Sequence, residues 1–172
     1  MTPPEPEFNP EPILIAFADA KIDFVVIGGV AGGAHGSAYA TFDVDLAYSR
    51  ERANLDRVAA LLRDLDATLR GAPEDEPFTL DARSLSEGGN FTFATALGNV
   101  DIFAFPAGAP PYDVLRGQAM EVVLEGRRVL VASLDHLIAM KEASGRDKDK
   151  LHASEYRVIS DLLRAPKEGE AG

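Results

Sequence analysis

Two aspartates, Asp43 and Asp45, stand two residues apart in a segment that alternates apolar and polar side chains. Side chains two residues apart on a β-strand point to the same face, with Cα atoms about 6.5–7 Å apart. Carboxylates that share one face repel each other unless a cation or a proton lies between them. Magnesium, which prefers oxygen ligands, suits such a pair. The pair would also fit the solvent-exposed face of an edge strand, although aspartate is uncommon in strands.

A third aspartate, Asp101, is the single charged residue in the segment 99–103. If Val100 and Ile102 face the core, strand alternation places Asp101 on a polar face. Should its strand lie beside that of Asp43 and Asp45, the three carboxylates converge. Such a cluster can hold two metal ions about 3.5–4 Å apart, the arrangement used for in-line phosphoryl displacement. Taken alone, Asp101 would be interpreted as an ordinary surface aspartate.

A glycine pair, Gly28-Gly29, directly follows the buried-strand pattern of residues 24–27. Glycine lets backbone amides approach an anion closely, and a helix that starts there directs its positive end toward phosphate. Two common phosphate-binding motifs do not match. Val30 stands where a dinucleotide-binding fingerprint needs glycine, and no Lys-Ser/Thr follows Gly33. The alternative is a tight strand-to-helix turn selected for packing.

Together these features resemble the polymerase-β-like nucleotidyltransferase superfamily. The segment 24–46 is similar to the branch that includes abortive-infection and toxin–antitoxin nucleotidyltransferases, which shows a strand, Gly-Gly, Ala, His-Gly and then Arg-x-Thr-x-Asp-x-Asp. The residues that match this pattern are Gly28, Gly29, Ala31, His35, Gly36, Thr41, Asp43 and Asp45. Downstream, residues 133–141 resemble the Ser-Leu-x-x-Leu-Ile-x-x-Lys helix of that branch, and residues 146–149 resemble its Arg-x-x-Asp turn.

The resemblance implies a role for each matching residue. Asp43, Asp45 and Asp101 would bind two magnesium ions and carry catalysis, with Asp101 helping to deprotonate the attacking hydroxyl. The groups implied to contact a nucleoside triphosphate are Gly28, Gly29, Thr41, Lys141 and Arg146. Arg146 and Asp149 would line or brace the site. One position departs from the pattern, because Tyr39 stands where the family has an arginine.

The activity that the resemblance implies is magnesium-dependent transfer of a nucleotidyl group from a nucleoside triphosphate to a hydroxyl acceptor. The acceptor is left open between RNA, a protein and a small molecule. A role in a toxin–antitoxin pair, with a cognate protein partner, is equally open. Two alternatives are a catalytically inactive binding or regulatory protein of the same fold, and a phosphotransfer or hydrolytic enzyme that reuses the metals.

Composition and charge narrow these choices. The 172 residues carry 17 basic and 28 acidic side chains, a net charge of −11, so general electrostatic binding to nucleic acid is not indicated, and neither is a transfer RNA acceptor. The absence of cysteine excludes disulfides, iron–sulfur clusters and cysteine-ligated zinc. We find no secretory signal pattern and no apolar stretch long enough to span a bilayer. We therefore expect a soluble, cytoplasmic protein without membrane contact.

The elements that must position these residues follow from hydrophobic periodicity. The patterns predict strands over 24–27, 41–48, 91–96, 100–105, 120–124 and 129–132. They predict helices over 13–20, 30–36, 50–70, 133–143 and 147–163.

We expect an α/β fold (α+β by stricter naming), the nucleotidyltransferase fold. A mixed twisted sheet would carry the site on one face and helices on the other, with a C-terminal helical pair closing the cleft. The expected organisation is a flexible arm over 1–12, a nucleotidyltransferase core over 13–132, a C-terminal helical segment over 133–165 and a tail over 166–172.

Overall fold

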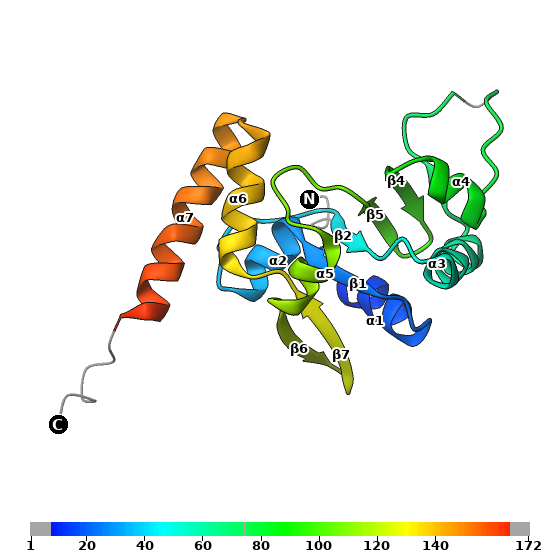
Figure 1. Cartoon of the computed structure of the whole chain (residues 1–172). Coiled ribbons are helices and arrows are strands. Elements are labelled where there is room, and N and C mark those ends of the chain that lie inside the picture. The colour runs from blue at the N-terminus through cyan, green and yellow to red at the C-terminus, as the bar shows by residue number, and fades with distance from the viewer. Residues whose placement is uncertain (1–7, 74, 166–172) are drawn as a thin grey trace, which may run out of the picture.

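A computed structural model describes residues 8–73 and 75–165 of the chain (Figure 1). Most of the arm predicted over 1–12 and the tail predicted over 166–172 lie outside the described residues. The first helix begins at Glu11, two residues earlier than its apolar spacing predicts.

One seven-stranded mixed sheet, with strand order β3-β4-β5-β2-β1-β7-β6, forms the centre of the molecule. Its strands are β1 Phe24–Ile27, β2 Val44–Tyr48, β3 Thr68–Leu69, β4 Asn90–Thr95, β5 Gly98–Phe103, β6 Met120–Leu124 and β7 Arg127–Val131. The strand pairs β2–β5 and β1–β7 are parallel, and the other neighbouring strands are antiparallel. The predicted mixed sheet is therefore confirmed.

The strand register divides the sheet into an apolar face and a polar face. Leu46 of β2 lies level with Ile102 of β5, and both side chains are fully buried. Asp45 lies level with Asp101 on the same two strands. Because side chains alternate along a strand, the two aspartates share the face opposite to Leu46 and Ile102.

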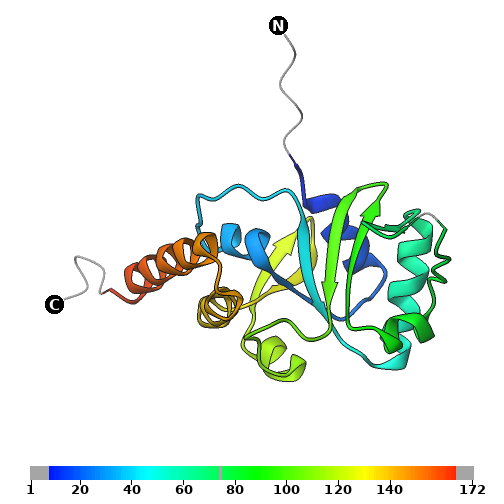
Figure 2. The same ribbon diagram turned by 90° about the horizontal axis from the view of Figure 1, so that it is seen from above.

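Three helices lie on the apolar side of the sheet (Figure 2): α1 Glu11–Asp19, α3 Arg52–Asp64 and α4 Ala82–Glu87. Phe17 of α1 packs edge-on against Phe24 of β1, with ring centroids 5.7 Å apart. The buried stripe of α3 consists of Leu55, Val58, Ala59 and Leu62. This is the amphipathic spacing that the sequence predicts for a helix lying on a sheet.

Three further helices lie on the same side of the sheet as the aspartates. Helix α2, Gly28–Ala34, follows β1 directly, and α6, Leu134–Ser144, packs against α7, Asp147–Arg164 (Figure 1). The Ser133 hydroxyl caps α6 by accepting a 3.2 Å hydrogen bond from the His136 amide. Gly145 then ends α6 in the left-handed conformation, with φ of 69°. The two helices predicted over 133–143 and 147–163 are therefore confirmed.

The helix predicted over 50–70 is wrong at its C-terminal end. Helix α3 stops at Asp64, and Asp66 adopts φ of 54°, a conformation that aspartate tolerates better than most residues. The chain then turns into β3, which pairs with β4. Arg70, which the periodicity assigns to the helix, therefore follows an edge strand instead.

Phe42 is a second correction. Alternation predicts Phe42 on the same face as Val44 and Leu46, but its side chain is 74% exposed. The reason is that β2 begins only at Val44, so no strand partner fixes the direction of the residues before it.

Two short helices, α4 and α5 (Tyr112–Gly117), are absent from the sequence prediction. Each has six residues, fewer than periodicity can detect. A capping signal does mark α4, since the Asp81 carboxylate accepts a 2.8 Å hydrogen bond from the Ser84 amide.

Across residues 8–73 and 75–165, no helix combines the length and the apolar character that crossing a bilayer requires.

Candidate active site

The structure brings the three predicted aspartates to one place on the polar face. Asp45 of β2 and Asp101 of β5 are directly paired across two parallel strands. Asp43 immediately precedes β2, and its carboxylate lies 3.6 Å from the same Arg70 side chain that contacts Asp101. The spatial prediction that Asp101 lies on the side of Asp43 and Asp45 is thus confirmed. Their roles as catalytic and metal-binding groups remain predictions.

Arg70 is a site residue that the sequence analysis missed. Its Nη2 donates to Asp101 Oδ1, and its Nη1 lies 3.6 Å from Asp43 Oδ1. The guanidinium therefore bridges the two outer carboxylates of the cluster. A signal was available in the sequence, because Asp66 can end a helix and Thr68-Leu69 can extend as a strand.

The electrostatics of the cluster show how closely the acids are placed. Burial raises the pKa of Asp45 to about 7, and the negative charges of Asp101 and Asp43 add to the effect. Burial also raises the pKa of Asp101, against the opposing influence of the Arg70 guanidinium. A raised pKa means that the surroundings provide too little positive charge to stabilise the ionised carboxylates. The cluster is thus suited to receive a cation.

Both glycines of the Gly28-Gly29 pair are needed for the close approach of the site residues. Gly28 has φ of 68°, and a Cβ atom there would collide with the Asp45 carboxylate. A Cβ atom on Gly29 would lie 2.9 Å from Cβ and Oγ1 of Thr41. Thr41 in turn donates a 3.1 Å hydrogen bond to the Asp43 carbonyl. The packing role of the glycines is therefore established, and contact of their amides with phosphate remains a prediction.

The C-terminal helical pair supplies cations that are held by one buried acid. Asp149 is fully buried and accepts hydrogen bonds from Ser144 (2.6 Å), Arg146 (2.6 Å) and Lys141 (3.3 Å). Burial alone would raise the pKa of Asp149, but these hydrogen bonds and the Lys141 charge lower it to about 2. Lys141 also acts on Asp45, whose pKa its charge lowers. Lys141 thus lies close enough to the cluster to influence it, and its contact with a triphosphate remains a prediction.

Two cavities meet at Asp45. The polar cavity, about 430 Å³, is lined by all three aspartates and by Thr41 and Lys148. The apolar cavity, about 310 Å³, is lined mainly by apolar side chains: Phe103, Phe105, Pro106, Leu137 and Met140. The two cavities share four lining residues, namely Asp45, Phe103, Lys141 and Arg146.

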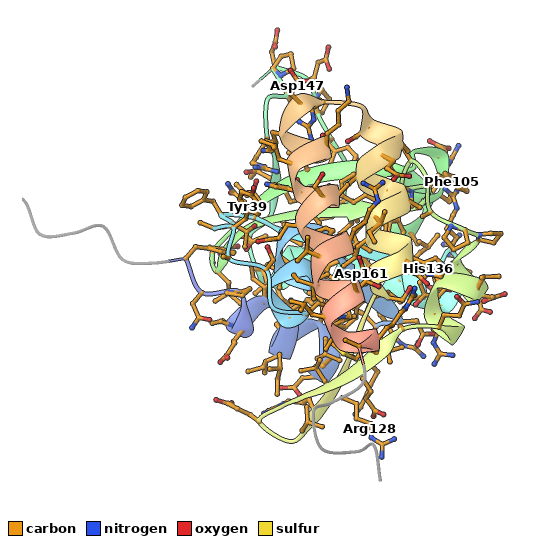
Figure 3. The ribbon with its side chains drawn as sticks, turned by 90° about the vertical axis from the view of Figure 1, so that its left-hand side faces the viewer. Tyr39, Phe105, Arg128, His136, Asp147 and Asp161 are labelled. Carbon is orange, nitrogen blue, oxygen red and sulfur yellow. The ribbon has the colours of Figure 1, made fainter. Side chains whose placement is uncertain are left out.

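Figure 3 labels one aromatic residue from the lining of each cavity. Tyr39 and Phe105 lie on opposite flanks of the α6–α7 pair, one at each cavity. Tyr39, at the position of the family arginine, packs against the His152 ring with centroids 4.2 Å apart. The polar cavity therefore has an aromatic wall where the resemblance predicts a cation.

His35 does not contribute to either cavity. Its Nε2 lies 2.8 Å from the Ala132 carbonyl oxygen, so the ring ties α2 to the segment that leads into α6. A structural function explains this histidine fully.

The donor set fits a hard cation, but the side chains are not arranged around one. Three carboxylates within one cluster supply the oxygen ligands that magnesium prefers. Among the described residues, however, no three acidic, histidine or cysteine side chains lie close enough together to hold one metal ion. Instead, the Arg70 guanidinium contacts Asp43 and Asp101. Binding of metal would therefore require a rearrangement of these side chains.

Comparisons with known proteins show similarity at the level of structure. No family model matches the chain, and no curated protein matches it either. The crystal structure of the lincosamide antibiotic adenylyltransferase LnuA, lincomycin-bound, superposes with a TM-score of 0.57 at 14% identity, over 86% of this chain and 93% of LnuA. The chain has the nucleotidyltransferase fold.

Two further structures support the nucleotidyltransferase fold. The solution structure of the antibiotic-resistance factor ANT(2'')-Ia has a TM-score of 0.51 at 20% identity, covering 88% of this chain and 80% of that protein. An antigenic nucleotidyltransferase-like protein from Paracoccidioides brasiliensis has a TM-score of 0.52 at 17% identity, with coverage of 88% and 73%. The expected nucleotidyltransferase fold is confirmed at this level, and the abortive-infection and toxin–antitoxin branch remains a prediction.

Proposed function

We propose that the protein transfers a nucleotidyl group from a nucleoside triphosphate to a hydroxyl acceptor, with magnesium as cofactor. The observation that carries this proposal is the pairing of Asp45 with Asp101 across β2 and β5, with Asp43 beside them and Gly28 packed against Asp45. The nucleotidyltransferase fold supports the same activity. Asp43, Asp45 and Asp101 would hold two Mg²⁺ ions, which would neutralise the charge that develops during phosphoryl transfer.

In the proposed reaction the acceptor hydroxyl oxygen forms a bond to the α-phosphorus, and the bond from that phosphorus to the leaving pyrophosphate breaks. Asp101 would take the hydroxyl proton. Lys141, held by Asp149, would offset the negative charge on the triphosphate, as Arg146 would from the other side of Asp149. Most of the rate acceleration would come from positioning and charge stabilisation.

The two cavities support a division between the substrates. The polar cavity adds Lys148 to the shared cations Lys141 and Arg146, which suits a triphosphate. The apolar cavity suits the body of a small acceptor whose hydroxyl extends past Asp45 toward Asp101, the residue paired with Asp45 on β5. Its volume lies at the lower end of the range for drug-sized ligands. LnuA was crystallised with lincomycin, so a small-molecule ligand occurs on a similar fold. We therefore favour a small-molecule acceptor over RNA or protein.

The test is product analysis with nucleotides labelled at the α- or the γ-phosphate. Each of the four nucleoside triphosphates is incubated with Mg²⁺ and lincomycin, tobramycin, bulk RNA or a cell extract as acceptor. We expect α-label on a small molecule together with release of pyrophosphate. Transfer of the γ-label would indicate phosphotransfer instead.

Two variants control this assay. Asp101→Asn removes the proposed proton acceptor and should abolish labelling. Asp135→Asn changes an exposed acid on α6, outside the carboxylate cluster, and should retain full activity.

A catalytically inactive binding or regulatory protein is the second candidate. The contacts of Arg70 with Asp43 and Asp101, and Tyr39 at the family arginine position, favour it. Binding of a nucleoside triphosphate without any labelled product would support this reading.

A toxin–antitoxin role would add a cognate protein, either as acceptor or as regulated partner. Such a partner would have to cover side chains that α7 exposes, namely Leu151, Val158, Leu162 and Leu163. Label on a protein band of the extract would support this form of the proposal.

A further inference from the structure

Arg70 places a positive charge within the carboxylate cluster. Its guanidinium touches Asp101 and lies 3.6 Å from Asp43, and its side chain is only 29% exposed. The Arg70 amide donates a 2.9 Å hydrogen bond to the Thr92 carbonyl, which fixes the backbone beside β4. Only the side chain is therefore able to change its position readily.

We propose that Arg70 is an internal counter-cation that competes with divalent metal for Asp43 and Asp101, and that transfers its guanidinium to the triphosphate when metal and nucleotide bind. This inference rests on the proposed function. It assigns to Arg70 a positioning role that couples the binding of metal to the binding of nucleotide.

The competition follows from charge and from shared ligands. Arg70 uses Oδ1 of Asp43 and Oδ1 of Asp101, the same two carboxylates that are expected to hold metal. A divalent ion placed among these oxygens would lie close to the guanidinium, and like charges in a half-buried site repel strongly. One of the two cations must therefore give way.

The transfer to phosphate follows from the hydrogen-bonding state of the guanidinium. Among the described residues, Arg70 Nε is a buried donor that has no acceptor. Guanidinium groups bind phosphate oxygens with two parallel donors, so a triphosphate offers the acceptors that Arg70 lacks.

The other cations at the site are less able to respond in this way. Lys141 and Arg146 are both tied to the buried carboxylate of Asp149. Arg70, in contrast, loses its partners as soon as metal occupies Asp43 and Asp101. Asp43 and Asp101 line the polar cavity, so a guanidinium released from them at that moment would start one side chain away from the proposed triphosphate site.

The test compares wild type with Arg70→Gln in two calorimetric titrations that do not depend on turnover or on the identity of the base. In the first titration, Mn²⁺ is added to the protein alone, and we expect Arg70→Gln to bind the ion about tenfold more tightly. In the second, Mg²⁺-tripolyphosphate is added, and we expect Arg70→Gln to bind it about tenfold more weakly. Arg70→Lys keeps the charge but loses the paired donors, and should fall between wild type and Arg70→Gln in both titrations.

Arg83→Gln is the matched control, because Arg83 pairs with Glu87 on the exposed side of α4 and contacts no aspartate of the cluster. It should leave both affinities unchanged. Unchanged or weaker Mn²⁺ binding by Arg70→Gln would overturn the inference, and so would a change of both affinities in the same direction, as a purely structural arginine would give. If no protein binds Mn²⁺ or Mg²⁺-tripolyphosphate, the proposed function fails together with the inference.

Discussion

Asp45 is the residue at which the electrostatic cost of the site is concentrated. Burial and the neighbouring acids raise its pKa from 3.8 to about 7. The folded protein therefore binds a proton that the unfolded chain releases at lower pH. The stability that this proton provides is present below pH 4 and is lost as the pH rises through 7.

Asp45→Asn should consequently stabilise the protein in a pH-dependent manner, because asparagine cannot ionise. In the presence of a chelator we expect a gain in unfolding free energy on the order of 2 kcal/mol at pH 8 and almost none at pH 4. Nucleotidyl transfer, assayed separately with Mg²⁺, should be abolished. Urea denaturation at the two pH values measures the gain. An equal gain at both would show that the charge of Asp45 is not responsible.

A substitution at Gly28 tests how closely the backbone must approach the Asp45 carboxylate. Gly28→Ala introduces a Cβ at a positive φ and directs it onto Asp45. We expect a loss of unfolding free energy of about 2 kcal/mol or more, with loss of activity, because left-handed backbone alone costs about 1–2 kcal/mol.

Gly33→Ala is the matched control within the same helix. Apart from its chain neighbours and the backbone of α2 itself, no heavy atom lies within 4 Å of a Cβ built on Gly33. Alanine there should be neutral or should stabilise the protein by up to about 1 kcal/mol. Chemical denaturation of the two variants side by side measures the contrast, and equal losses would show that the close approach to Asp45 is not what requires glycine at position 28.

At the scale of elements, the α6–α7 pair depends on Asp149, the buried acid that joins Lys141 to Arg146. Hydrogen bonds and the Lys141 charge overcome the effect of burial and hold the pKa of Asp149 near 2. A depressed pKa provides stability that is present above about pH 4 and is lost as the pH falls toward 2.

Asp149→Asn should therefore cost about 2–3 kcal/mol at neutral pH, and much less at pH 2–3. It should also weaken the binding of Mg²⁺-tripolyphosphate, since Lys141 loses its anchor. Thermal unfolding across this pH range measures the loss. Asp147→Asn, at a fully exposed position on the same helix, should change neither property.

Helices and strands with a strong hydrophobic periodicity could be predicted from the sequence, and those without one could not. The alternation of residues 44–48 and 99–103 placed Asp45 and Asp101 correctly, because a buried partner on each side of an aspartate fixes its direction. Strand β3 has two residues and α4 has six, too few for a period to emerge. Arg70 was missed for this reason, since its location depends on where α3 ends.

At the scale of the whole molecule, the order of motifs indicated the fold, but no local pattern specifies the relation between distant segments. The segment 24–46 and the helix that begins after Ser133 are about 90 residues apart, and they meet because β1 pairs with β7 in parallel. The two cavities lined by Asp45 exist only because these two segments lie side by side. Periodicity contains no information on their shapes, so the sequence leaves the acceptor open, and our preference for a small acceptor rests on the cavities and remains a proposal.

The net charge of −11 leads to a final prediction at this scale, which concerns the binding of transfer RNA. A polyanionic acceptor would have to approach a surface of the same sign, and RNA binding by proteins ordinarily relies on the release of counterions from phosphates by lysine and arginine. We expect a fluorescently labelled transfer RNA to show a Kd weaker than about 100 μM at physiological salt, measured by anisotropy, with little improvement at low salt. Excess transfer RNA should likewise leave transfer to a small acceptor unaffected. Micromolar binding that weakens steeply between about 50 and 200 mM salt would instead require a local basic surface, and it would return RNA to the acceptors that the site must accommodate.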